Sequence, residues 1–170
     1  MSLIRDERPA DAEAVSAVLV AAFGGGAEAR LVQRLRASGK IFCALVAEEK
    51  GRVLGHMVFS RIAVESGGSE IAVLAMAPLA VMPAFQRLGI GSALVSAGLE
   101  RCRMERHARV MVLGDPVYYG RFGFVPASRF GLKCPFPVPE ESFMAIELEP
   151  GAFAQVSGVV HYGHEFDDLE

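Results

Sequence analysis

Apolar residues recur along the chain with two periods, one typical of helices and the other of strands. After Asp11, a candidate helix cap, apolar side chains at helical spacing predict a helix that Gly24-Gly25-Gly26 ends. A second helix is expected over residues 27–38, with its arginines outward and Gly39 as its stop. The positions expected to be buried in these two helices are Ala14, Val15, Val18, Leu19, Ala22, Leu31, Val32 and Leu35.

Strand-like segments lie on both sides of these helices. Their residues are mainly apolar or β-branched, and clusters of glycine and charged residues separate them. Glu49-Lys50-Gly51-Arg52 predicts a hairpin turn, and Ser66-Gly67-Gly68-Ser69 predicts a second loop. The strands are expected over residues 2–8, 42–48, 53–64 and 70–81.

From Gly89 the pattern becomes helical again, and a further strand is expected over residues 109–114. Because a helix connects the strand at 70–81 to this one, the two strands are expected to be parallel, which makes a β-α-β unit. The apolar positions that define the helix are Ile90, Ala93, Leu94, Ala97, Gly98 and Cys102.

The last third of the chain is less regular. Asp115 followed by Pro116 predicts a capped short helix that closes near Gly123, with a strand starting at Phe124. The three prolines of residues 134–139 require an extended segment. A strand is expected over residues 143–149. Residues 150–170 are expected to form either an edge strand, at 156–162, or a tail. All of these elements are expected to belong to a single domain that spans residues 1–170.

Composition narrows the class of protein. The chain is 52% hydrophobic, but its uncharged run at residues 71–86 is broken by two prolines and is too short to span a bilayer. The first nine residues include charged side chains where a signal peptide needs an apolar core. A cytoplasmic protein is therefore expected, with no membrane partner. A net charge of −3 without a basic run argues against a nucleic-acid partner. The three scattered cysteines are expected to be reduced and buried.

The segment from Leu79 to Leu94 indicates an anion-binding loop between a strand and a helix. Arg87 is the only charged residue between Glu70 and Glu100, so no carboxylate competes for the free amides of the first helical turn. Two glycines allow an anion to approach the backbone closely. A phosphate or pyrophosphate is the expected ligand, although a purely structural glycine-rich helix start is the alternative. The amides belong to Leu88, Gly89, Ile90, Gly91 and Ser92.

Common phosphate-binding motifs do not fit this loop. A dinucleotide-binding fingerprint needs a third glycine where the chain has Leu94, and a Walker loop needs Gly-Lys-Ser/Thr. Gln86-Arg87-Leu88-Gly89-Ile90-Gly91 does resemble the Gln/Arg-x-x-Gly-x-Gly/Ala signature of the GCN5-related N-acetyltransferases (GNAT). Segments 55–60, 113–124 and 143–148 further resemble the YhbS-type bacterial branch of that family, so the resemblance covers nearly the whole chain.

The resemblance implies an α/β GNAT fold, with a mixed, mostly antiparallel twisted sheet flanked by helices. It also implies transfer of the acetyl group of acetyl-CoA to a primary amine, on a small molecule or a protein, by direct attack. The main chain of Leu79, Ala80 and Val81 would pair with the pantetheine arm, and Gln86 to Ser92 would hold the pyrophosphate. A homodimer is left open.

For the leaving thiolate, the family often places a tyrosine four residues before the glycine of a Gly-Phe pair, which here selects Tyr119. Tyr118 is the neighbouring alternative, but successive helical residues point about 100° apart, so only one of the two can face the sulfur. The alternative is that both tyrosines pack as core aromatics, and for Tyr118 this is the better interpretation. Many members carry an asparagine and a longer helix where this chain has Gly114-Asp115-Pro116, which leaves the adenine contacts open.

The base that deprotonates the amine is not identifiable from the sequence. Glu28, His56 and Asp115 have suitable chemistry. Each also has a structural explanation: Glu28 as a solvated helix residue, His56 as a hydrogen-bonded strand residue and Asp115 as a helix cap. A water chain could replace all three. The scattered histidines show no metal-ligand spacing. An acyl-CoA-binding sensor without turnover and a protein that binds another nucleotide at the same helix start are the alternative functions.

Overall fold

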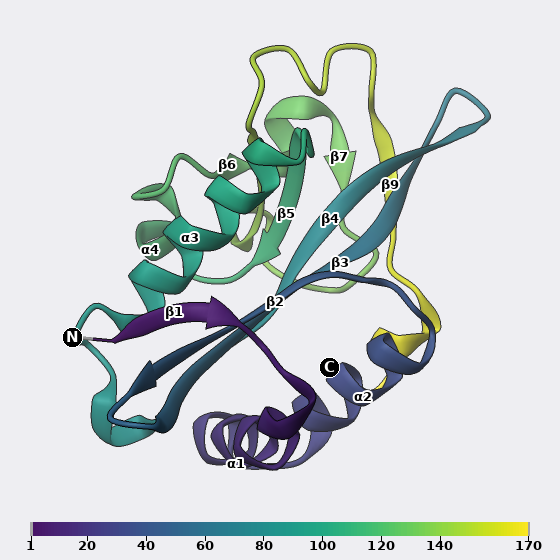
Figure 1. The fold of residues 1–170 in the computed structure, drawn as a ribbon. Helices are drawn as coiled ribbons and strands as arrows, with labels where there is room; N and C mark the ends of the chain where they lie inside the picture. Colours follow the sequence, from purple (N-terminus) through teal and green to yellow (C-terminus); the bar gives the residue numbers. More distant parts are fainter. Residues whose placement is uncertain (1, 170) are drawn as a thin grey trace. The chain divides into compact units, whose positions relative to one another are not determined.

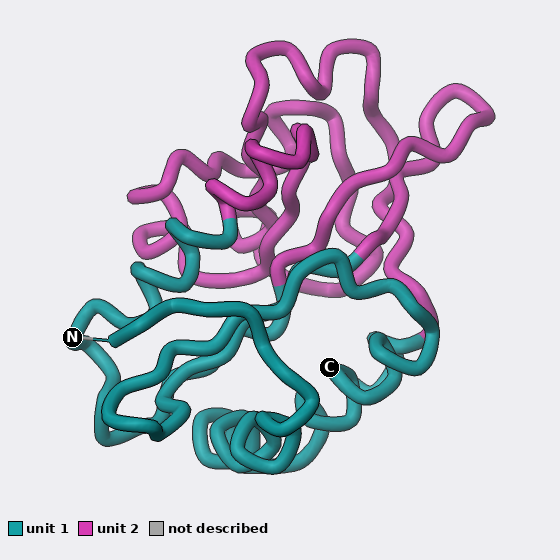
Figure 2. The backbone as a smooth tube through the Cα atoms, viewed as in Figure 1, with its two compact units in different colours: residues 1–60, 77–98, 165–170 teal, residues 61–76, 99–164 magenta. Residues whose placement is uncertain are grey.

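The computed structural model describes residues 2–169. The chain divides into two compact units (Figure 2). Unit 1 contains residues 1–60, 77–98 and 165–170, and unit 2 contains residues 61–76 and 99–164. Two strands and one helix each run from one unit into the other, so neither unit is a separate stretch of sequence. The single domain expected from the sequence stays a prediction.

The strands form a mixed, mostly antiparallel sheet whose hydrogen-bonded order is β1-β2-β3-β4-β5-β8-β6 (Figure 1). The pairs β4–β5 and β7–β9 are parallel. This agrees with the fold expected from the sequence, including the β-α-β unit. The strands are β1 (Leu3–Asp6), β2 (Ile41–Glu49), β3 (Arg52–Ser66), β4 (Ser69–Val81), β5 (Arg109–Leu113), β6 (Val125–Pro126), β7 (Leu132–Lys133), β8 (Phe143–Glu147) and β9 (Gly158–His161).

The α-helices begin and end close to the predicted residues, because local sequence signals fix them. They are α1 (Ala12–Phe23), α2 (Ala27–Ala37), α3 (Ile90–Met104) and α4 (Pro116–Gly120). Gly24 ends α1 at a φ of +74°, a left-handed conformation that costs glycine little. Among residues 2–169, no helix is long and apolar enough to cross a membrane.

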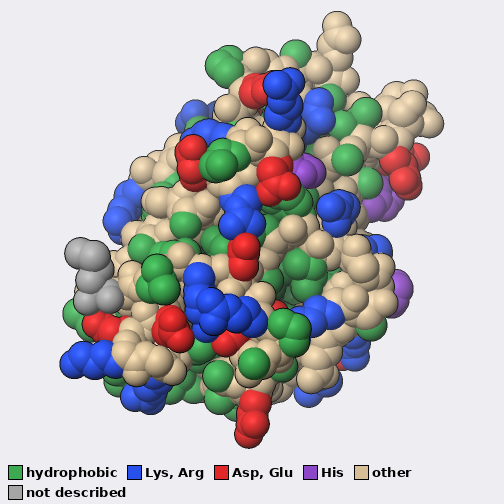
Figure 3. Space-filling view, in the orientation of Figure 1, with side chains coloured by type: hydrophobic (Ala, Val, Ile, Leu, Met, Phe, Trp, Pro, Cys, Tyr) green, Lys and Arg blue, Asp and Glu red, His purple; other side chains and the backbone are tan. Residues whose placement is uncertain are grey.

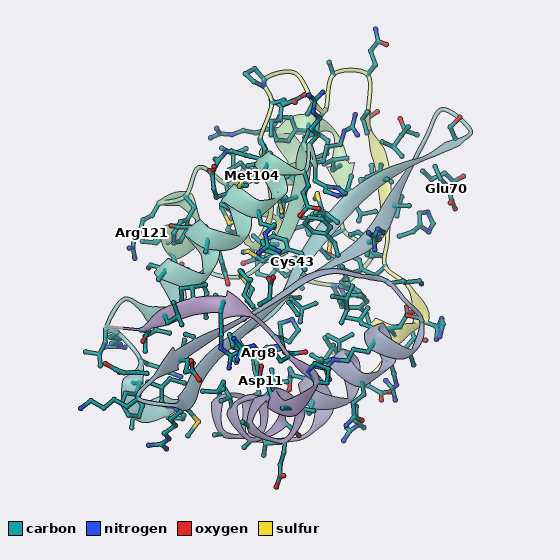
Figure 4. The ribbon with its side chains drawn as sticks, in the orientation of Figure 1. Arg8, Asp11, Cys43, Glu70, Met104 and Arg121 are labelled. Carbon is teal, nitrogen blue, oxygen red and sulfur yellow. The ribbon has the colours of Figure 1, made fainter. Side chains whose placement is uncertain are left out.

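Asp11 stands at the cap position of α1, but its side chain does not cap that helix. Its carboxylate accepts hydrogen bonds from the Arg8 amide at 2.7 Å and from two guanidinium nitrogens of Arg5 at 2.8 and 2.9 Å. Arg8 and Asp11 lie together just before α1 (Figure 4). The two charge-assisted bonds to Arg5 explain why the carboxylate turns away from the helix. The expectation that Asp11 caps the helix is therefore wrong, although the helix starts where expected.

In unit 1, the two faces of β3 have different neighbours. A Cβ at Gly98 of α3 would lie 2.3 Å from Phe59 and 2.4 Å from Met57, so these two side chains face α3. Because side chains alternate along a strand, His56 and Ser60 point to the opposite face. There the Nε2 atom of His56 lies 2.6 Å from a carboxylate oxygen of Glu7.

In unit 2, β8 pairs with β5 along its whole length and with β6 at its centre. The C-terminal strand is shorter than predicted, and it does not lie at an edge: β9 pairs with β3 through Val160 and His161 and with β7 through Gly158 and Val159. The two-residue strand β7 was not predicted from the sequence. The proline-rich residues 134–139 form neither helix nor strand, but they are not simply extended as predicted: the chain bends at residues 135–137, and the amide of Val138 donates to the carbonyl of Phe136 at 2.9 Å.

Candidate functional site

The predicted anion loop lies between the end of β4 at Val81 and the start of α3 at Ile90. Pro83–Phe85 form a single 3-10 turn, and the chain then passes through two left-handed residues, Arg87 at a φ of +64° and Gly89 at +89°. Left-handed residues turn successive amides toward one side of the backbone, an arrangement that favours anions. A non-glycine residue in this conformation is uncommon and costs about 1 kcal/mol or more.

The charges around the loop also favour an anion. The first turn of α3 carries no acidic residue, and the side chain of Arg87 is exposed. No atom lies within 4 Å of the position that a Cβ would take on Gly89, so the loop is open at this point. Elsewhere acidic and basic side chains are interspersed over the face that Figure 3 presents. The charge and the open backbone of the loop are thus those that binding of a phosphate group would require.

Three contacts hold the loop to the strands of unit 1. The side-chain amide of Gln86 donates to the carbonyl of Val81 at 3.0 Å. The amide of Met82 donates to the carbonyl of Leu54 at 2.8 Å. The guanidinium of Arg52 lies 5.6 Å from the centre of the Phe85 ring, within cation–π distance. Because these contacts fix both the entry and the first turn of the loop, its shape is set within the protein itself.

A second glycine on β3 sets how closely α3 approaches the sheet. A Cβ at Gly55 would lie 3.0 Å from side-chain atoms of Ile90 and Leu94 and 3.3 Å from the carbonyl oxygen of Ala80. The first turn of α3 therefore packs directly over Gly55, beside the end of β4. Gly98 was expected on the apolar side of the helix, but the close approach at Gly55 and Gly98 was not predicted, although a glycine inside a strand or helix pattern is a signal for it.

The end of β4 has the properties needed for main-chain contacts with a ligand. The parallel ladder between β4 and β5 pairs Leu74 with Val110 and Ala75 with Met111, whereas β4 continues to Val81. Leu79 and Val81 are partly exposed and Ala80 is buried. Together with the loop that follows, all of the predicted cofactor-binding residues lie in unit 1.

Tyr119 belongs to unit 2, on the short helix α4. The carboxylate of Asp115 caps this helix, as predicted, by accepting from the amide of Val117 at 2.9 Å. The Tyr119 ring makes edge contacts with the rings of Tyr118 and Phe124, whose centres lie 5.0 and 5.9 Å away. Burial, with smaller contributions from Tyr118 and Asp115, raises the pKa of Tyr119 to about 12. The hydroxyl therefore keeps its proton at neutral pH.

The structure separates the three candidate bases by their surroundings. His56 is fully buried and paired with Glu7, which supports its structural interpretation. The carboxylate of Glu7 also pairs with Arg36. Burial by itself would raise the pKa of Glu7, but its contacts with His56 and Arg36 outweigh burial and lower this pKa. Asp115 is engaged as a helix cap, and Glu28 is partly exposed in the first turn of α2. Within residues 2–169, no group of three or more His, Cys, Asp or Glu could share a metal ion.

Known proteins are similar to this chain in both sequence and fold. A family model described as an acetyltransferase (GNAT) domain matches residues 40–126. Over 166 residues the chain is 38% identical to the uncharacterized N-acetyltransferase YhbS of Escherichia coli (strain K12), covering 97% of this chain and 98% of that protein.

Two crystal structures extend the similarity to three dimensions. YhbS from Escherichia coli in complex with CoA has a TM-score of 0.93 at 37% identity, covering 99% of this chain and 93% of that one. A GNAT family acetyltransferase from Brucella melitensis in complex with acetyl-CoA has a TM-score of 0.82 at 34% identity, covering 98% of this chain and 99% of that one. Since sequence and fold agree over nearly the full length, this chain belongs to the GNAT family of acetyltransferases.

Proposed function

We propose that the protein transfers the acetyl group of acetyl-CoA to a primary amine, on a small molecule or a protein, by direct attack. The observation that carries this proposal is the loop at the start of α3, where the left-handed Arg87 and Gly89 precede a helical turn without acidic residues. Two similar proteins were crystallised with CoA and acetyl-CoA, which supports the same ligand here.

In this proposal the residues of unit 1 hold the acetyl donor. The side chain of Arg87 and the amides of Leu88 to Ser92 bind the pyrophosphate, while Gln86 keeps the loop on β4. The main chain of Leu79, Ala80 and Val81 pairs with the pantetheine arm and polarises the thioester carbonyl, as an oxyanion hole does.

The reaction needs one proton donor and one proton acceptor. Acetyl-CoA supplies the acetyl group as a thioester, and a C–N bond to the amine replaces the C–S bond. The hydroxyl of Tyr119 donates its proton to the departing sulfur and regains one from solvent. The raised pKa of Tyr119 keeps its hydroxyl protonated before the reaction. It also makes this hydroxyl a weaker acid than an ordinary phenol.

The amine nitrogen must lose a proton. Since His56 is enclosed and Asp115 caps α4, we assign this proton to a water chain or to Glu28. Replacing Glu28 by Gln tests the second choice, because only a base would change the pH profile of kcat/KM.

Calorimetry with acetyl-CoA, CoA and ATP, followed by turnover measurements with a panel of amines, tests the proposal. We expect both CoA compounds to bind, ATP to bind much more weakly, and at least one amine to be acetylated. Binding of acetyl-CoA without turnover on any amine would favour the alternative of an acyl-CoA sensor. Equal binding of ATP would favour a different nucleotide as the ligand.

A further inference from the structure

Gly114 directly follows β5, and the ring of Tyr119 occupies the space beside its Cα. A Cβ atom added to Gly114 would lie 2.3 Å from Cε2, 3.0 Å from Cδ2 and 3.5 Å from Cζ of that ring. Real Cβ atoms essentially never approach other atoms below 3.0 Å. Any residue other than glycine at position 114 would therefore displace the Tyr119 ring or the backbone beside it.

The backbone at position 114 does not itself require glycine. Its φ is outside the left-handed range in which side chains are strained. Its amide donates to the carbonyl of Ser142 at 3.0 Å, a bond that alanine would also make. The contact with Tyr119 is thus the steric reason for glycine here.

Other contacts of the ring restrict where it can move. The Tyr119 amide donates to the Asp115 carbonyl at 3.0 Å, which fixes the backbone of α4 next to Gly114. The rings of Tyr118 and Phe124 contact the Tyr119 ring by their edges, and Phe124 is buried. The ring is therefore held by aromatic neighbours as well as by the space that Gly114 leaves.

We propose that Gly114 is a positioning residue for catalysis: the absence of its side chain places the hydroxyl of Tyr119 where it can protonate the leaving thiolate. This inference rests on the proposed function, because it assigns Gly114 a role through the Tyr119 hydroxyl. To reach ordinary contact distance from an alanine Cβ, the ring must shift by about 1 Å, and a misplacement of this size in a catalytic group can cost about 100-fold in rate.

A double-mutant cycle between Gly114→Ala and Tyr119→Phe tests the proposal. We expect Gly114→Ala to lower kcat about 100-fold with an unchanged dissociation constant for acetyl-CoA. In the Tyr119→Phe background, where no hydroxyl remains to be placed, Gly114→Ala should change kcat less than about 3-fold. A purely structural glycine would instead lower the rate equally in both backgrounds.

Gly120→Ala is the matched control, because Gly120 ends α4 close to the same ring but no atom lies within 4 Å of its Cβ position. Its kcat should match that of the unmodified protein. A normal rate in folded Gly114→Ala, or additive losses in the cycle, would overturn the role of Gly114 and leave the function of Tyr119 intact. An unchanged rate in Tyr119→Phe would overturn the acid role itself and, with it, this inference.

If Gly114→Ala does not fold, the contact is tested by adding Tyr119→Ala, which removes the ring that the new methyl group meets. Recovery of folding, followed by circular dichroism and thermal unfolding, would support the close approach of Gly114 and Tyr119. Failure to recover would show that glycine is needed for another reason and would overturn the proposal.

Discussion

The side chain of Gln86 is bound to the main chain of Val81, by a hydrogen bond of 3.0 Å from its amide nitrogen to the carbonyl oxygen. Val81 is the last residue of β4, and Gln86 is the first residue of the proposed pyrophosphate loop. The bond closes this segment on itself, so the loop holds its shape before a ligand arrives. Such preorganisation lowers the entropy that binding must offset.

Replacing Gln86 by Ala should weaken acetyl-CoA binding about 3- to 10-fold, the effect of losing one hydrogen bond of roughly 1 kcal/mol. The melting temperature should change little, because the side chain is exposed. Calorimetry measures the affinity, and Gln33→Ala on the exposed face of α2 is the control. Equal affinities for the two variants would contradict the role of Gln86.

Arg87→Gly should separate stability from binding. Glycine adopts the φ of +64° without strain, so the free energy of unfolding should stay within about 1 kcal/mol of its original value. Affinity for acetyl-CoA should fall about 10-fold, because a charge-assisted hydrogen bond is lost. The control is Arg103→Ala in the last turn of α3, where the arginine forms an exposed ion pair with Glu100. A similar loss of affinity in the control would argue against a local role for Arg87.

Tyr119→Phe should lower kcat by about 100- to 10,000-fold, the range for positioned acid catalysis, with little change in the KM for acetyl-CoA. Phenylalanine keeps the ring contacts with Tyr118 and Phe124 and removes only the hydroxyl. Tyr118→Phe is the control and should leave kcat nearly unchanged. Steady-state kinetics with an accepted amine decides between them, and greater damage from Tyr118→Phe would mean that the wrong tyrosine has been chosen.

The buried carboxylate of Glu165 should make the protein sensitive to acid. Burial opposes the charge, but hydrogen bonding, including a bond of 3.1 Å from the ammonium of Lys40, outweighs it and lowers the pKa of Glu165 from 4.5 to about 2. Because the pKa of Glu165 is lower in the folded than in the unfolded state, its ionised carboxylate stabilises the fold at pH values above the unfolded-state pKa of 4.5. This stability is lost as the pH falls from about 4.5 to about 2.

Glu165→Gln should therefore cost about 1–3 kcal/mol of unfolding free energy at pH 7, and the difference should shrink as the pH falls from 5 toward about 2. Denaturant unfolding at several pH values measures this, with exposed Asp167→Asn as the control. A difference that does not depend on pH would show that the charge of Glu165 does not stabilise the fold.

Gly98→Ala should destabilise the packing of α3 on β3. The new Cβ would lie 2.3 Å from Phe59 and 2.4 Å from Met57, and overpacking of a core typically costs about 1–3 kcal/mol. Since the same helix begins at the proposed pyrophosphate loop, acetyl-CoA affinity should fall as well. Gly25→Ala is the control, because no atom lies near its Cβ position and its φ is not left-handed. Thermal unfolding and calorimetry of both variants test the prediction.

Local signals allowed much of the fold to be predicted. Lys50 and Gly51 adopt positive φ values in the expected hairpin, and Asp115 caps the expected short helix. Such features depend on the conformational preferences of a few adjacent residues, so the sequence is sufficient to specify them. The family motif likewise occupies consecutive residues, 86–91, and the similarity to known acetyltransferases confirms the family that it indicated.

By itself, the sequence determined the approximate positions of the α-helices and of most strands, the family, and which residues form the candidate loop. The tertiary structure decided which side chains meet, such as His56 with Glu7 and Asp11 with Arg5. It also decided which strands pair, such as β9 with both β3 and β7. It also showed that Gly114 leaves space for the Tyr119 ring. These contacts depend on strand pairing and on the close packing of side chains from different elements, and neither leaves a periodic pattern in the sequence.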